Sequence, residues 1–298
     1  MELNEYQLKA AKTDLNPNTR EGLLISLLGL SGEAGELLTI YKKHLRDGDA
    51  FTTFNRAVVE ELGDILWYLT STATKYGISL EQIAEENLKK TYHRWSEEPK
   101  GAITTKRYDE QYPSTQQLPR KITFCIREQN AGSYPTVVIY ADDMQVGDPL
   151  TDNSYTDDGY RYHDVFHISY LAVLGWSPVL RKHLSRKRKS SLAVDEVEDG
   201  GRANVIEEGI AALVYSYAKD HNWLQGIKHV DDDLLKTIKK MTDHLEVKDR
   251  KEKQWEEAIL QGYDVWRQLQ QCKQGYITAD MDNRKLSFAP FGDYKSKG

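Results

Sequence analysis

Hydrophobic and polar residues alternate along the first hundred positions with the spacing of amphipathic helices. Residues that lie three or four apart share one face of a helix, so an apolar stripe at this spacing favours α-helix. Thr19 is expected to cap the second of the helices, and Gly77 to end the third. The pattern predicts a module of four helices, at residues 3–13, 20–46, 52–76 and 79–95.

The pattern changes after this module. Residues 99–120 contain three prolines and few aliphatic side chains, which is typical of a linker. Two β-rich runs, residues 122–128 and 136–144, predict a hairpin. Helical spacing then returns, and residues 275–288 predict a last pair of short strands. The sequence therefore predicts a mainly α protein. A helical domain at 1–98 and a linker at 99–120 would precede an α+β domain with a hairpin and helical bundle at 121–298.

The two halves share a weak similarity. The segment "RAVVEELGDILWYLTSTATKYG" resembles "RANVIEEGIAALVYSYAKDHNW", and "LLISLLGLSGEAGELL" aligns with "FHISYLAVLGWSPVLR". With a one-residue gap that places Glu60 and Glu61 on Glu207 and Glu208, Glu61 corresponds to Glu208, whereas Asp64 corresponds to Ala211. A degenerate repeat of the first module within the second half is therefore one hypothesis.

Composition narrows the class of protein. The 298 residues are 39% hydrophobic and 29% charged, with a net charge of −6, which is typical of a soluble globular chain and makes nucleic-acid binding unlikely. The polar N-terminus does not resemble a signal peptide, and no apolar run approaches the roughly 18 residues of a membrane helix. With two cysteines far apart, Cys125 and Cys272, a reducing cytoplasmic location is expected.

Four acidic residues stand among apolar ones in the two longest helices. Glu33 and Glu36 share a face of the second helix, and Glu61 and Asp64 share a face of the third. Consecutive helices with a short connection pack antiparallel, so the two pairs could meet. Clustered carboxylates repel one another unless a cation lies between them, and oxygen ligands select Mg²⁺, Mn²⁺ or Ca²⁺. The alternative is that each pair belongs to a solvated helix face.

A polar stripe follows on the fourth helix. Asn87, Lys90 and Arg94 have the spacing of one continuous face. An amide, an ammonium and a guanidinium beside a bound cation suit a phosphorylated ligand that also carries a base. A solvated basic face is the alternative.

The motifs "GLSGEAGELL", "VVEELGDILWYL" and "GISLEQIAEENLKKTYHRW" together resemble the MazG-like, all-α nucleoside triphosphate pyrophosphohydrolases. Their motif is E-x-x-E, a spacer and E-x-x-D, and the resemblance spans roughly residues 3–95. It implies Mg²⁺-dependent cleavage between the α and β phosphates of a ribo- or deoxyribonucleoside triphosphate, with Mn²⁺ as a substitute. It also implies sites built at subunit contacts, hence a homo-oligomer or an intramolecular pseudo-dimer.

The resemblance implies roles for the candidate residues. Mg²⁺ would be held by Glu33, Glu36, Glu61 and Asp64. One of the glutamates, Glu36 among them, could instead orient or deprotonate the attacking water. The phosphates would lie against Lys90 and Arg94, and the base or sugar against Asn87.

Other signals lie in the second half. His163 and His167 are four apart with Asp164 beside the first, a spacing that can bind a transition metal, although buried, hydrogen-bonded histidines are the more common outcome. The basic run 181–190 could bind phosphates or pair with the acidic segment 195–201. The Asp-rich stretch 142–158 matches no EF-hand and is expected to be a surface loop.

The sequence therefore predicts a Mg²⁺-dependent nucleoside triphosphate pyrophosphohydrolase. Two alternatives from other classes remain: a nucleotide-binding regulatory protein without turnover, and a nucleic-acid-binding adaptor that acts through residues 181–190.

Overall fold

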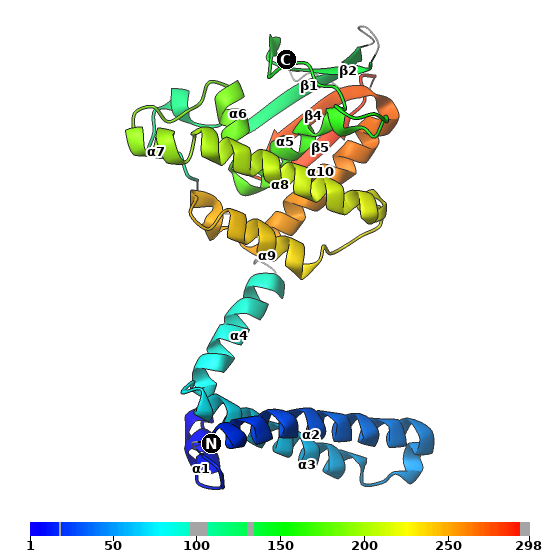
Figure 1. Cartoon of the computed structure of the whole chain (residues 1–298). Coiled ribbons are helices and arrows are strands. Elements are labelled where there is room, and N and C mark those ends of the chain that lie inside the picture. The colour runs from blue at the N-terminus through cyan, green and yellow to red at the C-terminus, as the bar shows by residue number, and fades with distance from the viewer. Residues whose placement is uncertain (18, 96–106, 130–133, 293–298) are drawn as a thin grey trace. The chain divides into compact units, whose positions relative to one another are not determined.

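The computed structural model describes residues 1–17, 19–95, 107–129 and 134–292 of the chain, with residues 93–95 described as backbone alone. The chain forms two compact units, Met1–Tyr92 and His93–Gly298. Figure 1 shows that the first unit consists of helices and that the second combines helices with a sheet. Each unit is described by itself.

The first unit contains the four predicted helices: α1 (Leu3–Ala11), α2 (Arg20–Asp47), α3 (Phe54–Lys75) and α4 (Leu80–Trp95). Thr19 caps α2 as predicted, because its side chain accepts a hydrogen bond from the backbone N–H of Gly22. α2 ends at Gly48, whose φ of 55° is accessible to glycine at little cost. The four-helix prediction is confirmed.

α2 and α3 pack as an antiparallel pair (Figure 1), and two contacts define their register. The hydroxyls of Ser26 and Ser71 lie 2.9 Å apart. One turn further along α2, Gly29 faces the ring of Tyr68, and a Cβ atom at Gly29 would lie 2.2 Å from that ring. Each turn forward along α2 therefore matches a turn back along α3, which brings the next turns, with the acidic residues, opposite one another.

The first unit has few buried hydrophobic side chains for its size. Within its described residues these are Ala10, Ile40, Ala73 and Leu80. Large apolar side chains are instead exposed on α2 and α3, among them Leu24, Ile25, Leu28, Leu38, Leu45, Val59 and Leu62. Exposed apolar surface of this extent marks an interaction site.

α2 also tests the expectation that no apolar run is long enough to cross a membrane. Residues Arg20–Ala50 are long and apolar enough to cross a membrane, with a mean hydropathy of 1.5 over the best 18 residues. By this measure, the expectation that no apolar run approaches the length of a membrane helix is wrong. Two glutamates interrupt the apolar run, but its mean hydropathy stays high. A single helix of this kind also occurs in soluble proteins.

The second unit is built on a five-stranded antiparallel sheet of order β3-β2-β1-β4-β5. The predicted hairpin is confirmed as β1 (Lys121–Gln129) with β2 (Thr136–Ala141), and the predicted last strand pair as β4 (Gln274–Asp280) with β5 (Lys285–Ala289). β3 (Met144–Gln145) extends the edge. β4 pairs with β1, so the end of the chain completes the sheet.

Helices cover one face of this sheet. α5 (Asp164–Leu174) and α10 (Glu252–Cys272) pack closely, with the rings of Phe166 and Tyr263 stacked 4.7 Å apart. On β1, Ile122, Phe124 and Ile126 alternate toward the core. The remaining helices are α6 (Pro178–His183), α7 (Leu192–Val197), α8 (Gly201–Asp220) and α9 (Asp232–Met241).

The structure departs from the predicted linker. Of residues 99–120, the part up to 106 lies outside the described residues, and residues 107–120 pack onto the second unit. Tyr108, Asp109 and Leu118 are buried, and the Asp109 carboxylate accepts hydrogen bonds from the Leu118 amide and from Arg181. The prolines and polar residues of this segment predicted a linker. Its packing could not be predicted from them, because a few anchoring side chains suffice to hold an irregular segment.

The second unit also differs from what the hypothesis of a repeat predicts. The segment aligned with α2 is not one long helix in the second unit: α5 ends at Gly175, with φ 64°, and Ser177 caps the separate helix α6. The second unit therefore does not reproduce the long helix pair on which the alignment rests.

Candidate metal centre

Three of the four predicted acids come together between α2 and α3. Glu33 on α2 and Glu61 and Asp64 on α3 each offer a carboxylate oxygen, and these oxygens lie within 4.8 Å of one another. Glu33 and Glu61 are half-buried and Asp64 is exposed. The cluster is thus held by two rigid helices and open to solvent, as a site for a small polar ligand requires.

Glu61 experiences the charge of all its acidic neighbours. Partial burial and the interaction with Glu33 raise the pKa of Glu61 above its ordinary value, and the charges of Glu36 and Asp64 raise it further. Carboxylates that share a site disfavour one another's ionised forms. A divalent cation between these oxygens would relieve the repulsion.

Glu36 has a different position. Its side chain is exposed, and it is not among the three carboxylates whose oxygens approach one another. It still acts on Glu61 through its charge. That the four acids hold a metal ion remains a prediction for all of them, and the observed convergence includes three of the four.

The donor set fits a hard divalent cation. All three converging ligands are carboxylate oxygens, with no nitrogen or sulfur among them. Mg²⁺ is bound in proteins by a few carboxylates together with water and substrate phosphates, and Mn²⁺ accepts the same ligands.

The polar stripe on α4 lies apart from the acids of its own chain. Asn87 and Lys90 are exposed, and within the described residues no hydrogen bond or ion pair joins either side chain to the cluster. Figure 1 shows α4 leading away from the α2–α3 pair. The side chain of Arg94 lies outside the described residues. The role of this stripe in substrate binding stays a prediction.

The basic run 181–190 is largely used within the second unit. The Arg181 and Arg188 side chains are buried, and Arg188 pairs with Asp199 at 2.7 Å and with Glu246 at 2.7 Å. Lys187 pairs with Asp195 at 3.0 Å. These partners include the acidic segment 195–201, as one of the two sequence interpretations expected. Buried guanidinium groups cannot reach a nucleic acid.

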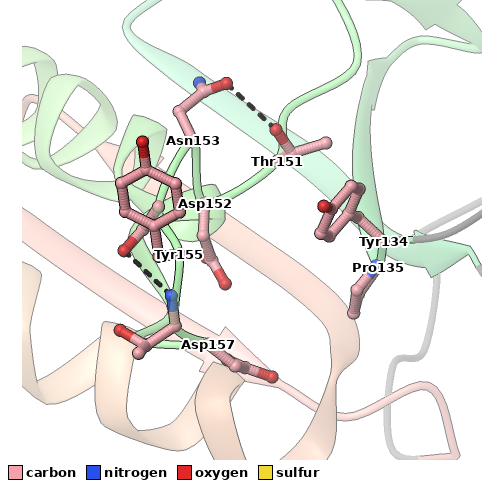
Figure 2. Close-up of a pocket in the computed structure, with 9 residues that line it drawn as sticks. Tyr134, Pro135, Thr151, Asp152, Asn153, Tyr155 and Asp157 are labelled. Carbon is pink, nitrogen blue, oxygen red and sulfur yellow. Dashed lines mark hydrogen bonds between the residues drawn. The ribbon is translucent and has the colours of Figure 1, made fainter.

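The Asp-rich loop is organised by an arginine. The buried Arg161 side chain pairs with Asp152 at 2.6 Å, with Asp157 at 2.7 Å and with Glu128 at 2.9 Å. The same loop lines a pocket of about 470 Å³, with Tyr134 on its opposite side (Figure 2). The aspartates therefore neutralise a buried cation, and the loop lies at the surface as predicted.

The second unit contains another group of potential metal ligands, which sequence reasoning found only in part. His163, which immediately precedes α5, and His167 on α5 are joined by Glu208 on α8, with one ligand atom of each within 4.8 Å of the others. His167 is fully buried and hydrogen-bonded, as expected. Glu208 was missed as a member of this group, because nothing in its local sequence indicates which side chain α5 brings near it.

Comparison with known proteins follows the same division of the chain. A sequence model of the MazG nucleotide pyrophosphohydrolase domain matches residues 23–97, and a model of the MazG C-terminal domain matches residues 103–292. Gene 37 protein of Mycobacterium phage L5 is 37% identical over 101 residues, which make up 32% of this chain and 89% of the phage protein. No solved structure matches the chain. The first matched region contains all four acids.

Proposed function

The chain belongs to the MazG family, and from this premise we propose that it is a Mg²⁺-dependent nucleoside triphosphate pyrophosphohydrolase. Water would add across the anhydride bond between the α and β phosphates of a ribo- or deoxyribonucleoside triphosphate. The products would be the nucleoside monophosphate and pyrophosphate. The observation that carries the proposal is the convergence of Glu33, Glu61 and Asp64 on one point of the α2–α3 pair.

Three of the acids would hold the metal, and the fourth would act on the attacking water. Glu33, Glu61 and Asp64 are the residues that would bind Mg²⁺ (or Mn²⁺), and the bound ion would supply charge neutralisation for the triphosphate and a more acidic water. Glu36 is exposed and is not one of the three converging carboxylates, but its charge acts on Glu61. We assign to Glu36 the role of orienting the attacking water or accepting its proton.

A second copy of the chain is part of this proposal. A partner copy would cover the apolar side chains exposed on α2 and α3. The predicted substrate residues Asn87 and Lys90 are exposed and are therefore accessible to such a copy. A homo-oligomer would bury the apolar face and bring α4 of one copy to the acids of another. Within this proposal Lys90 and Arg94 contact phosphates, and Asn87 contacts the base or sugar.

The location follows from the substrate. Nucleoside triphosphates are substrates of the cell interior, and Cys125 and Cys272 are free thiols, which suits the reducing cytoplasm.

The direct test is release of pyrophosphate. The purified full-length chain is incubated with Mg²⁺ and each ribo- and deoxyribonucleoside triphosphate in turn, and pyrophosphate and monophosphate are quantified. Glu61→Gln should lower the rate at least about 100-fold, because the cluster loses a charged ligand. Glu60→Gln is the matched control, since Glu60 is exposed on the adjacent position of α3 and does not face the cluster.

The result also separates the rival functions. Nucleotide binding without pyrophosphate release from any triphosphate would favour the regulatory protein. The nucleic-acid adaptor has little support, because Arg181 and Arg188 are buried in ion pairs. Salt-sensitive DNA or RNA binding that weakens when Arg186 and Lys187 are neutralised would revive it.

A further inference from the structure

We propose that His163, His167 and Glu208 form a second metal site, specific for a divalent transition metal such as Zn²⁺, in the C-terminal unit. The site is independent of the acidic cluster on α2 and α3. It consists of a histidine at the N-cap of α5, a histidine within α5 and a glutamate from α8, and it differs from the first site in having nitrogen donors.

Hydrogen bonds orient both imidazole rings. The Nδ1 atom of His163 lies 2.9 Å from the carbonyl oxygen of Tyr160, and Nδ1 of His167 lies 2.9 Å from Oε1 of Glu207. A carbonyl only accepts, so Nδ1 of His163 carries the proton. In a neutral ring, each Nε2 then bears the lone pair that binds a metal. Metal-binding histidines commonly donate their other N–H to a carboxylate or carbonyl.

Glu207 is an ionised acceptor that fixes His167. Its carboxylate also accepts hydrogen bonds from the Ser177 hydroxyl, at 2.7 Å, and from the Val179 amide, at 2.8 Å. With these donors in place, Glu207 has no proton to give to His167 and takes the Nδ1 proton as a hydrogen bond. The ring of His167, which is fully buried, is thereby locked with Nε2 pointing toward the other two ligands.

The unused donor atoms meet at one point. Nε2 of His167 is buried and has no hydrogen-bond partner among the described residues; its nearest acceptor, Oε2 of Glu208, is 3.3 Å away. Nε2 of His163 lies 3.9 Å from the same oxygen. Ligands about 2.0–2.1 Å from a tetrahedral zinc lie about 3.4 Å from one another, so small side-chain movements would complete the geometry.

The site would keep an open coordination position. Three protein ligands leave one place in a tetrahedral zinc shell. The Glu208 side chain is 47% exposed, so solvent reaches the ligand group. Asp164 is the available fourth ligand, since its Oδ1 lies 3.4 Å from Nε2 of His163. A water molecule or the oxygen of an anionic ligand would otherwise occupy the position.

Metal binding by the full-length chain tests this proposal. The background variant is Glu61→Gln with millimolar Mg²⁺ present, which removes or saturates the acidic cluster; Mg²⁺ competes poorly for imidazole. Titration with Co²⁺, followed by visible absorption, and with Zn²⁺, followed by calorimetry, should give about one equivalent per chain. His163→Gln and Glu208→Gln should each weaken binding at least about tenfold.

Controls separate loss of the site from loss of the fold. Both substitutions keep a polar side chain, and circular dichroism should be unchanged. His221→Gln is the matched control: it removes a histidine from the end of α8, whose Nδ1 contacts the carbonyl of Tyr217, and it should bind metal normally. If the wild-type site takes up no stoichiometric Co²⁺ or Zn²⁺, or if the two variants bind as tightly as the control, His167 is only a charged bridge between two glutamates and the proposal is overturned.

Discussion

Glu61 is the residue through which the candidate centre can be probed most directly. It lies close to the other acids. Its pKa is raised by its partial burial and by the negative charge around it. For a carboxyl group with a raised pKa, the folded state binds protons more strongly than the unfolded state, so stability falls as pH rises through the folded pKa. A bound cation would reverse this effect, which makes protons and Mg²⁺ competitors at the site.

Glu33→Gln tests the interaction between the carboxylates of the cluster. Removing this charge should move the pKa of Glu61 down toward its ordinary value of 4.5, because the strongest acidic neighbour is lost. Carbon-detected NMR titration of the glutamate carboxyl groups in the metal-free protein would measure the shift. Glu60→Gln should leave the Glu61 titration unchanged. An equal shift in both variants would mean that the carboxylates do not interact in solution.

At the scale of elements, the register of α2 against α3 determines which side chains meet. The Ser26–Ser71 contact and the close approach of Tyr68 to Gly29 align the two helices. The acids lie on the next turns of each helix, beyond these contacts. The length of α3 between Tyr68 and the acids is therefore critical, whereas the connection at the other end of the pair has more freedom.

An insertion series would test this register. One alanine inserted between Leu66 and Trp67 should rotate the preceding part of α3 by about 100° relative to Tyr68, and so turn its acids away from α2. Pyrophosphate release should fall about 100-fold, as expected for misplaced catalytic groups. One glycine inserted between Asp49 and Ala50, in the connection of the two helices, should have little effect. Equal loss in both would exclude the register as the cause.

A buried polar network joins the α1–α2 turn to this helix pair. Lys75 forms an ion pair with Asp14, and the Ser71 hydroxyl donates to the same carboxylate at 2.9 Å. The side chains of Lys75 and Asp14 are only 4% and 11% exposed. Burial alone would raise the pKa of Asp14, but the hydrogen bonds from Lys75, Asn16 and Ser71 lower it below its ordinary value. The ionised Asp14 therefore adds to the free energy of unfolding above pH 3.8, and this contribution is lost as pH falls through the pKa of Asp14 in the folded state.

Lys75→Met should therefore destabilise the first unit by about 2 kcal/mol, because it leaves Asp14 buried without its cation. Hydrogen exchange of the α2 and α3 amides under native conditions would report the loss for this unit alone. Lys9→Met removes an exposed ion pair with Glu5 and should cost less than about 0.5 kcal/mol. Similar costs for the two variants would show that the network contributes nothing beyond surface charge.

At the scale of the whole molecule, the two units differ in how they are stabilised. The second unit has a continuous core between its sheet, α5, α8 and α10. The first has few buried apolar side chains and many exposed ones. In the proposed homo-oligomer, a second copy of the same helix pair would cover this exposed apolar surface.

Leu28→Lys tests this assembly. The Leu28 side chain is 63% exposed on α2, and a charge there should be tolerated by a monomer but not by a buried contact. Light scattering should show the mass falling toward that of one chain, 34.3 kDa. Leu192→Lys, at a position 85% exposed in the second unit, should leave the mass unchanged. A wild-type protein that is already a monomer would contradict the proposed assembly.

Mixing two inactive variants tests whether the site is shared between copies. Glu61→Gln removes an acid, and Lys90→Ala removes a predicted phosphate contact on α4. If each site combines the acids of one copy with α4 of another, the mixture should regain about one quarter of wild-type activity, because half the dimers are mixed and each has one intact site. No gain in a mixture shown by mass to have exchanged subunits would place the whole site within one chain.

The sequence by itself determined the elements that depend on local pattern. Helical spacing and the Thr19 cap predicted the four helices of the first unit, and β-rich runs predicted the hairpin. The last pair of short strands was also predicted from the sequence. The two acid motifs were readable for the same reason, since spacing within a helix decides which side chains share a face. Residues 107–120 were misread because their packing depends on distant partners such as Arg181.

Only the tertiary structure decided which side chains from different elements meet. The convergence of Glu33 with Glu61 and Asp64 follows from the register of two helices. The burial of Arg188 against Asp199 and the approach of Glu208 to the histidines of α5 follow likewise from helix packing. The physical reason is that local spacing sets the direction of a side chain along its own element, whereas packing of elements distant in sequence sets what it faces.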